Sequence, residues 1–320
     1  MRQFEIHNDK ILDKGEVSYL GIHVNNLKNN IISLEDKEWL PFLRFCYSLG
    51  DLGVLSGIFE AIKQKYPNIK IAIPSNEYLL NVFGENYLSQ WNYKNTTGAF
   101  NNIVDIYKNN PYIDGLFDVG NFPQIYTDHD RCYTSLDTVD GKICSTPEPL
   151  AKQILRRFGF TEEELYNIDI KPKLYFDKEE TQNFKQKLHN IIGDKEYGCL
   201  LFASRFNKDT RWEHDNLLFE AAEKFKNKPV FYYSSFDLTN TPWDSYFPER
   251  YNFLELNIPI REQLYIKSEA LFNISYQAGI TDASNIGKSE NHILVPNNTI
   301  RENCIQDTYY YYPNGEIKKY

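Results

Sequence analysis

Apolar and polar positions follow the same order in two blocks of the chain, and the first block begins near residue 42. An apolar run at 42–47 leads into a Gly-containing turn at 48–53, and apolar residues then recur three and four positions apart over 54–66. That spacing predicts a helix, Pro67 ends it, and residues 69–73 predict the next strand. The order strand, turn, helix, strand is typical of a βαβ unit.

The second block begins near residue 198. It predicts strands at 198–203, 229–233, 270–274 and 292–295, and helical segments at 213–225, 261–267 and 282–286. The tail differs, since 308–312 and 315–320 predict a hairpin around Pro313, Asn314 and Gly315. The whole pattern predicts an α/β protein with two Rossmann-like domains facing a cleft. A ligand is expected in that cleft, at the C-terminal ends of the strands.

The domain boundaries follow from two polar regions. Residues 1–40 are polar and weakly patterned, so we expect an N-terminal extension packed on the first domain. The polar stretch 167–173 separates the two blocks, which gives a first domain at 41–168 and a second at 169–320. Both lengths are within the usual range for a domain.

Composition excludes several classes of protein. The 320 residues are 42% hydrophobic and 25% charged, the balance of a folded globular protein. A net charge of −9 argues against a nucleic-acid partner, which would need a concentrated basic face. The 5 cysteines are widely spaced without a C-x-x-C pair, so reduced thiols are expected rather than disulfides or a zinc site. No membrane span or signal peptide is visible, which predicts a cytoplasmic protein with at most peripheral membrane contact.

The turn at 48–53 is the first place where chemistry is expected. Asp51 follows Gly50 where a strand meets the start of a helix, so its carboxylate would stand at the mouth of the cleft and could act as a general base. A helix cap formed by Asp51 or Ser48 is the commoner role for such residues and stays open as the alternative. The chain has neither G-x-G-x-x-G nor a P-loop, which argues against a dinucleotide site.

Several stretches together resemble a known family. They are Ser-Leu-Gly-Asp at 48–51 with Lys-Tyr-Pro at 65–67, and then 110–117, 150–160, 171–174, 203–208 with Trp212, and 275–282. In this order they resemble the bacterial lipopolysaccharide heptosyltransferases of glycosyltransferase family 9. The resemblance covers roughly residues 42–296, and each motif is weak alone.

The resemblance implies a two-domain GT-B glycosyltransferase that inverts the anomeric centre without a metal or other cofactor. A nucleotide-diphosphate sugar would be the co-substrate, and the acceptor would be a hydroxyl of a surface glycan or of a lipopolysaccharide-type glycolipid. Asp51 would be the catalytic base. The residues implied in donor binding are Gly50, Arg205, Lys208, Arg211, Gln277, Gly279, Thr281 and Asp282. For the three cations, a solvated surface loop is the plain alternative.

The chain departs from the family pattern in its second domain. Gln277 and Ala278 stand where the family has Asp-Thr, and Asp282 stands where it has His. An acid close to a diphosphate repels it unless the carboxylate holds a hydroxyl instead. Two further hypotheses therefore stay open: a catalytically inactive nucleotide-sugar or glycan-binding protein, and a sugar-nucleotide epimerase on the same scaffold.

Asp128 and Asp130 form a competing motif. Their D-x-D spacing is the one that metal-dependent glycosyltransferases use to hold a divalent cation against a diphosphate. No strand leads convincingly into them, and short acidic triplets are frequent by chance in an acidic chain. We therefore expect no metal site and place both residues on the acceptor side.

Overall fold

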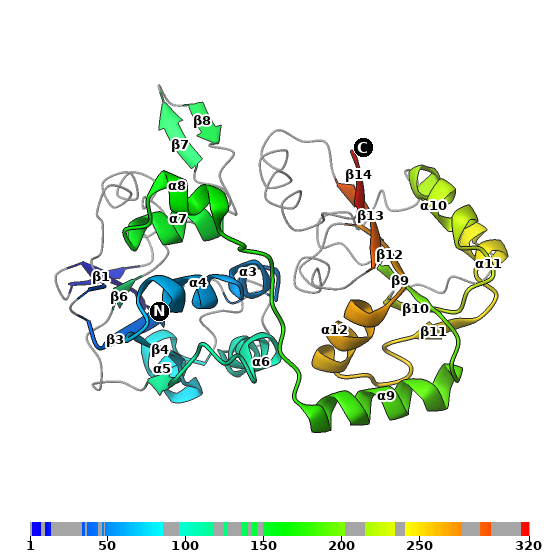
Figure 1. Ribbon diagram of the computed structural model, residues 1–320, viewed down its shortest axis with the longest axis horizontal. Coiled ribbons are helices and arrows are strands. Elements are labelled where there is room, and N and C mark those ends of the chain that lie inside the picture. Colours follow the sequence, from blue (N-terminus) through cyan, green and yellow to red (C-terminus); the bar gives the residue numbers. More distant parts are fainter. Residues whose placement is uncertain are drawn as a thin grey trace. The chain divides into compact units, whose positions relative to one another are not determined.

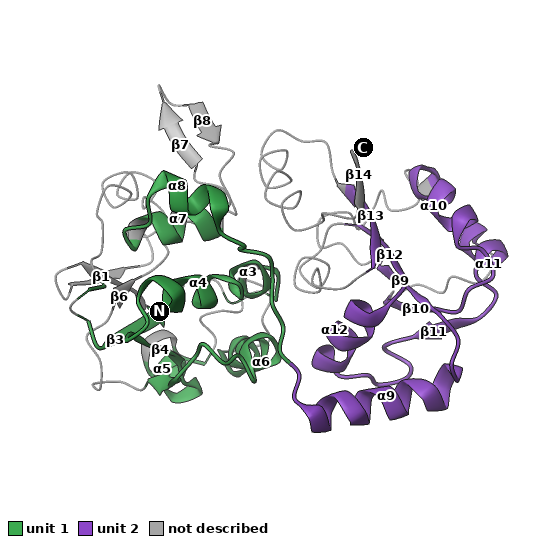
Figure 2. Cartoon of the chain, viewed as in Figure 1, with its two compact units in different colours: residues 1–175 green, residues 176–320 purple. Residues whose placement is uncertain are grey.

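The computed structural model describes residues 2–7, 10–13, 34–35, 37–43, 47, 49–85, 96–117, 125–126, 136–139, 142–145, 150–201, 215–233, 241–276, 289–295 and 315–319. The chain forms two compact units, residues 1–175 and 176–320 (Figure 2). The sequence analysis placed the boundary after residue 168. The division falls later because Lys173 pairs with Glu60 and the ring of Tyr175 packs edge-on against Tyr112, which keeps both residues in the first unit.

The first unit is built around a parallel sheet with the strand order β5-β4-β3-β6 (Figure 1). Its strands are β3 (Trp39–Leu43), β4 (Lys70–Pro74), β5 (Gly115–Phe117) and β6 (Ile125–Tyr126). Two antiparallel pairs accompany it, β1 (Arg2–His7) with β2 (Lys10–Asp13) and β7 (Leu136–Val139) with β8 (Lys142–Ser145). The helices are α3 (Leu49–Leu55), α4 (Ile58–Lys65), α5 (Asn76–Phe83), α6 (Thr96–Tyr107), α7 (Leu150–Arg157) and α8 (Glu162–Asn167).

Phe59 on α4 lies at the centre of this unit's core. Its ring meets Phe42 of β3 edge-on at 5.1 Å between centroids and Tyr107 of α6 at 5.0 Å. Edge-on pairs of buried rings add packing energy to the area they remove from water. The strand β3, the helix α4 and the helix α6 are therefore held to one another by a single aromatic cluster.

The second unit is a six-stranded sheet with the order β11-β10-β9-β12-β13-β14, parallel throughout. Its strands are β9 (Gly198–Leu201), β10 (Val230–Tyr233), β11 (Arg250–Asn252), β12 (Phe272–Tyr276), β13 (Glu290–Val295) and β14 (Gly315–Lys319). Its helices are α9 (Lys178–Ile192), a 3₁₀ turn at Asp215–Leu218, α10 (Phe219–Lys224), α11 (Pro242–Tyr246) and α12 (Ile260–Glu269).

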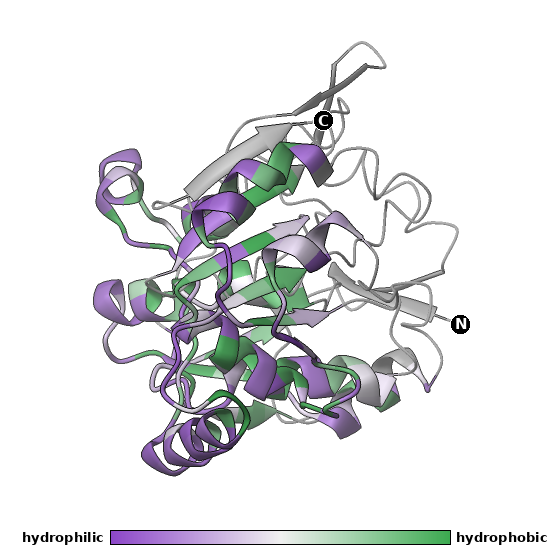
Figure 3. Cartoon of the chain, turned by 90° about the vertical axis from the view of Figure 1, so that its right-hand side faces the viewer, coloured by the Kyte–Doolittle hydropathy of each residue, from purple (hydrophilic) through white to green (hydrophobic). Residues whose placement is uncertain are grey.

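Side chains alternate across the strands and build a separate core on each face of this sheet. Leu200, Phe272 and Ile274 pack with Trp243 of α11 on one face. Cys199 and Phe231 pack on the other with residues of α9 and α12. In Figure 3 the central strands are largely green, and the helices around them carry both hydrophobic and hydrophilic residues. A parallel sheet covered on both faces explains why β9 and β10 consist almost entirely of apolar residues.

The turn expected at 48–53 is wrong, because α3 begins at Leu49 and places Gly50, Asp51 and Gly53 inside a helix. Burial of Leu52 and Leu55, at 1% and 0% exposed, compensates for glycine's poor helix propensity of about 1 kcal/mol per residue. The helix ends before Ser56 and Gly57, and α4 begins at Ile58.

The end of the chain adds an unexpected parallel strand to the sheet of the second unit. Residues 315–319 form β14, which pairs parallel with β13 in the register His292 to Glu316. The expected hairpin partner at 308–312 lies outside the described residues, as does the helical turn expected at 282–286.

Within the described ranges, no helix has both the length and the apolar character needed to cross a membrane.

Candidate functional site

The strand order of the second unit reverses between β9 and β12. The chain adds β10 and β11 on one side of β9, and then β12, β13 and β14 on the other. The two central strands run parallel in the register Gly198 to Phe272 and Leu201 to Ser275, so they end at the same edge. In open α/β sheets, ligands bind outside the carboxyl ends of the strands at such a reversal. This edge is the candidate site of the second unit.

The donor residues expected from the sequence follow these two strands. Arg205, Lys208 and Arg211 come after β9, and Gln277, Gly279, Thr281 and Asp282 come after β12. All seven lie outside the described residues, so the structure does not place their side chains. It does show that the two segments carrying them leave neighbouring strands at one edge of the sheet.

Two polar residues within β12 were not singled out from the sequence. Asn273 and Ser275 alternate with apolar residues and are 3% and 0% exposed. Asn273 donates from Nδ2 to Asn291 Oδ1 at 3.0 Å. Within the described part of the chain, neither Asn273 Oδ1 nor Ser275 Oγ has a hydrogen-bond partner. The signal that could have revealed them is the alternation Phe-Asn-Ile-Ser-Tyr in a strand that is otherwise apolar.

Cys199 is a buried residue of β9, two positions before the strand ends. Burial raises the pKa of its thiol to about 12, although the nearby positive charge of Lys267 acts in the opposite direction. A thiol with so high a pKa is almost fully protonated at neutral pH and is a poor nucleophile. Cys199 is therefore a core residue, as the expectation of reduced thiols allows.

The first unit has the same kind of reversal beside β3. β4 and β5 lie on one side of β3 and β6 on the other, and the chain passes from β3 into α3. Gly50 and Asp51 are the second and third residues of this helix. Gly50 is buried, whereas the side chain of Asp51 lies outside the described residues.

Tyr47, two residues before α3, is held by a hydrogen bond from α6. Asn102 donates from Nδ2 to the carbonyl oxygen of Tyr47 at 3.0 Å, and the ring of Tyr47 is 2% exposed. The first turn of a helix has N–H groups without intrahelical partners and carries a partial positive charge. Because α3 begins at Leu49, Asp51 is not the N-cap residue expected as the alternative, and its acidic side chain is favoured by this partial charge whether or not it acts as a base.

No metal ligand set is visible where the structure describes the chain. Among those residues, no three His, Cys, Asp or Glu side chains come together as a metal site requires. Asp128 and Asp130 lie outside the described residues, so their expected acceptor-side position stays a prediction and the competing metal motif stays an alternative.

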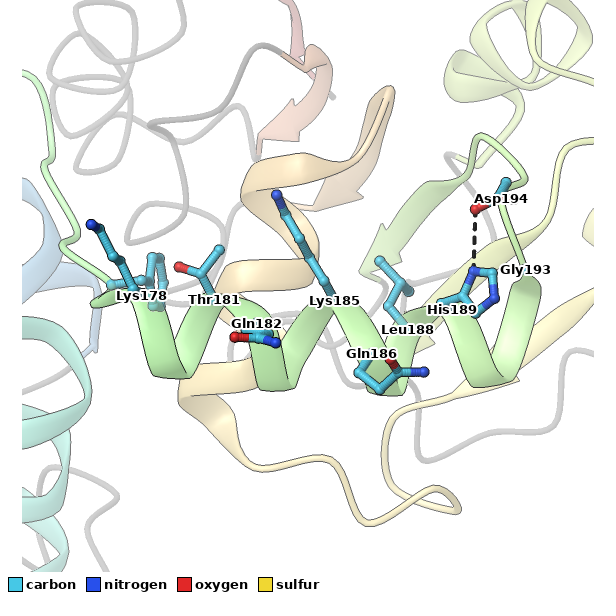
Figure 4. Close-up of a pocket in the computed structure, with 10 residues that line it drawn as sticks. Lys178, Thr181, Gln182, Lys185, Gln186, Leu188, His189, Gly193 and Asp194 are labelled. Carbon is cyan, nitrogen blue, oxygen red and sulfur yellow. Dashed lines mark hydrogen bonds and ion pairs between the residues drawn. The ribbon is translucent and has the colours of Figure 1, made fainter.

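Two surface hollows lie elsewhere. One, of about 620 Å³, is lined by one side of α9 and the turn after it, where His189 Nδ1 lies 3.1 Å from Asp194 Oδ1 (Figure 4). The other, of about 490 Å³, lies between α4 and α8, where Lys65 Nζ pairs with Glu164 at 2.7 Å. Neither hollow includes a strand-end residue, and in the second one the Lys65 ammonium is already paired with Glu164.

Comparisons with known proteins bear on the fold. No protein-family model matches the sequence, and no match is found among curated proteins. Among solved structures, a glycosyl transferase family 9 protein from Veillonella parvula DSM 2008 is similar over 91% of this chain and 88% of its own, with a TM-score of 0.55 and 12% identity. This likeness confirms the expected α/β fold with two Rossmann-like units.

Two further structures match with a TM-score of 0.45. The E. coli ADP-heptose lps heptosyltransferase II is 9% identical, with 88% of this chain and 90% of that chain covered. The E. coli heptosyltransferase WaaC with ADP is 14% identical, with 88% and 92% covered.

Proposed function

We propose that this protein is an inverting glycosyltransferase that moves a sugar from a nucleotide-diphosphate sugar to a hydroxyl of a glycan or lipopolysaccharide-type acceptor. The observation that carries the proposal is the reversal of strand order between β9 and β12. Both segments that carry the proposed donor residues directly follow the two strands at that reversal. The likeness of the fold to a glycosyl transferase family 9 protein and the order of the sequence motifs support the same activity.

The nucleotide-sugar donor is proposed to bind to the second unit. Arg205, Lys208 and Arg211 supply positive charge to the diphosphate, whose negative charge grows as the bond to the sugar breaks. Gly279 lets the backbone approach the nucleotide because it has no Cβ. Gln277, Thr281 and Asp282 then bind hydroxyl groups of the ribose or the sugar. No cofactor is needed for this reaction, and a cytoplasmic location is part of the proposal.

The acceptor is proposed to bind to the first unit. The Asp51 carboxylate takes the proton of the acceptor hydroxyl as its oxygen attacks the anomeric carbon. The oxygen enters on the face opposite the diphosphate, the bond from the anomeric carbon to the diphosphate oxygen breaks, and the nucleoside diphosphate leaves. One displacement of this kind inverts the anomeric centre. Asp128 and Asp130 are proposed to contact the acceptor.

The first experiment measures melting temperatures in the presence of ADP-, GDP-, UDP- and CMP-sugars. A ligand that binds the native state alone raises the melting temperature. We expect one nucleotide-diphosphate sugar to do so and to release nucleoside diphosphate in the presence of EDTA. Activity that EDTA abolishes and manganese restores would instead assign a metal to Asp128 and Asp130.

The second experiment tests the donor residues. Arg205→Ala and Lys208→Ala should each weaken donor binding roughly tenfold or more, because each removes a charge-assisted contact with the diphosphate. Lys226→Ala is the control, since this surface lysine of the same unit pairs with Glu223 at 3.5 Å. Equal donor affinity in all three variants would remove the segment after β9 from the site.

A binding protein without catalysis is the second candidate, favoured by Gln277, Ala278 and Asp282 standing in place of the family residues. It predicts a rise in melting temperature without release of nucleoside diphosphate. An epimerase on this scaffold predicts instead a changed sugar that stays attached to the nucleotide.

A further inference from the structure

The segment that leads from the first unit into the second is anchored to the junction of α3 and α4. We call residues 170–175 the strap. Ser56, at this junction and 1% exposed, donates from Oγ to the carbonyl oxygen of Gly53 at 2.7 Å. The same hydroxyl accepts the backbone N–H of Lys173 at 2.6 Å. One buried hydroxyl therefore joins the last turn of α3 to the strap.

Gly57 shows how closely the strap approaches. A Cβ at this position would lie 2.2 Å from the carbonyl oxygen of Lys171. The backbone of Gly57 has φ −79° and ψ −18°, which any residue adopts, so glycine is not needed there for its conformation. It is needed because the strap's backbone fills the space of a side chain.

Side-chain contacts also hold the strap. The Lys173 ammonium pairs with Glu60 of α4, and Tyr112 OH donates to Glu60 Oε1 at 2.9 Å. Tyr175 packs edge-on against Tyr112 with ring centroids 6.2 Å apart. Since Phe176 begins the second unit, the strap is fixed to the first unit up to the residue where the second begins.

The helix α3 needs such a support. It has 7 residues, among them Gly50 and Gly53, and glycine is the poorest helix former after proline. A helix this short is not stable by itself in water, so tertiary contacts decide its position. Its carboxyl end is held by Ser56, and Ser56 is held by the strap.

We propose that Ser56 and Gly57 are positioning residues for Asp51, and that the strap sets the place of α3 through them. This inference rests on the proposed function, in which Asp51 is the base. The segment that connects the two units then also fixes the helix that carries the acceptor-side base. A displacement of the reacting group by about 1 Å is enough to slow a reaction 10²-fold.

Hydrogen exchange tests the mechanical part of the proposal without any substrate. In Ser56→Ala and Gly57→Ala, amides of residues 53–55, which follow the first four N–H groups of α3, should exchange at least tenfold faster than in the parent, because local opening becomes easier. Ser268→Ala is the matched control. Its hydroxyl also donates to a carbonyl three residues earlier, Tyr265 at 2.8 Å, but in the second unit. Unchanged exchange at 53–55 in both variants would overturn the proposal.

A double-mutant comparison tests the catalytic part. The readout is release of nucleoside diphosphate from the ADP-, GDP- or UDP-sugar that binds, with water in place of the acceptor. Ser56→Ala should lower kcat roughly tenfold with KM for the donor unchanged, and should have no further effect in the Asp51→Asn background. The same loss in both backgrounds would mean that Ser56 does not act through Asp51.

The two failures can be told apart. Full activity of Asp51→Asn overturns the proposed base, and with it the catalytic role of the strap, whatever the exchange data show. Normal exchange at 53–55 in Ser56→Ala and Gly57→Ala, with Asp51→Asn inactive, overturns the positioning role and leaves the proposed function intact.

Discussion

The ring of Phe272 fills the space beside Gly198 on the neighbouring strand. A Cβ on Gly198 would lie 2.1 Å from the ring's Cζ, and the two residues are register partners of β12 and β9. The ring is 0% exposed and stacks on Phe225 at 4.1 Å between centroids. At the reversal of the sheet, the Phe272 ring of β12 thus packs directly on the backbone of Gly198 in β9. A side chain at residue 198 would prevent this contact.

Gly198→Ala should therefore destabilise the second unit. The new methyl group must displace a packed ring, and overpacking of this kind costs about 1–3 kcal/mol. Gly115→Ala is the control, because Gly115 also lies in a strand, β5, but a Cβ there would meet no atom within 4 Å. Urea unfolding followed by circular dichroism measures both. Equal stability of the two variants would show that the ring gives way without cost.

The ion pair between Glu60 and Lys173 should make stability depend on pH. The hydrogen bond from Lys173 lowers the pKa of Glu60 below its ordinary 4.5. A carboxyl group with a lowered pKa in the folded state stabilises the protein above the unfolded pKa and loses this effect as pH falls through the folded one. Glu60→Gln should thus be less stable than the parent at pH 7, by about 1 kcal/mol. The difference should shrink as pH falls below about 4.5.

Glu162→Gln provides the comparison for that experiment. The pKa of Glu162 is also lowered, by its hydrogen bond with Arg156, but its side chain is 77% exposed and water screens the pair. Thermal unfolding at pH 7 and pH 4 should find a smaller pH-dependent difference for this variant than for Glu60→Gln. A Glu60→Gln difference that stays constant between the two pH values would rule out a charged Glu60 as its cause.

Ser275 should respond to mutation differently from Ser56, although both hydroxyls are buried. In the described part of the chain Ser275 Oγ has no hydrogen-bond partner, while Ser56 Oγ makes two hydrogen bonds. Removal of an unsatisfied buried hydroxyl is neutral or stabilising, and removal of a bonded one costs about 1–3 kcal/mol. Melting temperatures of Ser275→Ala and Ser56→Ala compare the two directly. An equal drop would mean that Ser275 has a bonding partner in the folded protein.

Local periodicity was enough to predict much of the fold. The apolar spacing over 54–66 and the run at 69–73 correspond to α4 and β4 because each element buries one regular face. The turn expected at 48–53 failed for a different reason. Its glycines suggest a turn locally, whereas the burial of Leu52 and Leu55 that makes α3 a helix depends on tertiary packing.

The supports of the candidate site could not be predicted in this way. The hydrogen bond from Lys173 N to Ser56 Oγ joins residues 117 positions apart, and a single sequence gives no sign of such a pair. The parallel pairing of β14 is similar, since the local pattern Pro-Asn-Gly indicates a hairpin and the partner β13 is brought in by the rest of the sheet. The two segments with the proposed donor residues follow β9 and β12, where open α/β sheets bind their ligands.

The most direct test of the proposed function is the effect of Asp51→Asn on release of nucleoside diphosphate from the donor that binds. The amide keeps the size of the side chain and its ability to accept a helix N–H, but it cannot take a proton. We expect turnover to fall roughly 10²- to 10⁴-fold, with donor affinity and melting temperature nearly unchanged. A purely structural role, in which the Asp51 charge stabilises the first turn of α3, predicts instead that Asp51→Asn keeps its activity and loses about 0.3–1 kcal/mol of stability. Transfer at the parental rate by Asp51→Asn would contradict the assignment of Asp51 as the base.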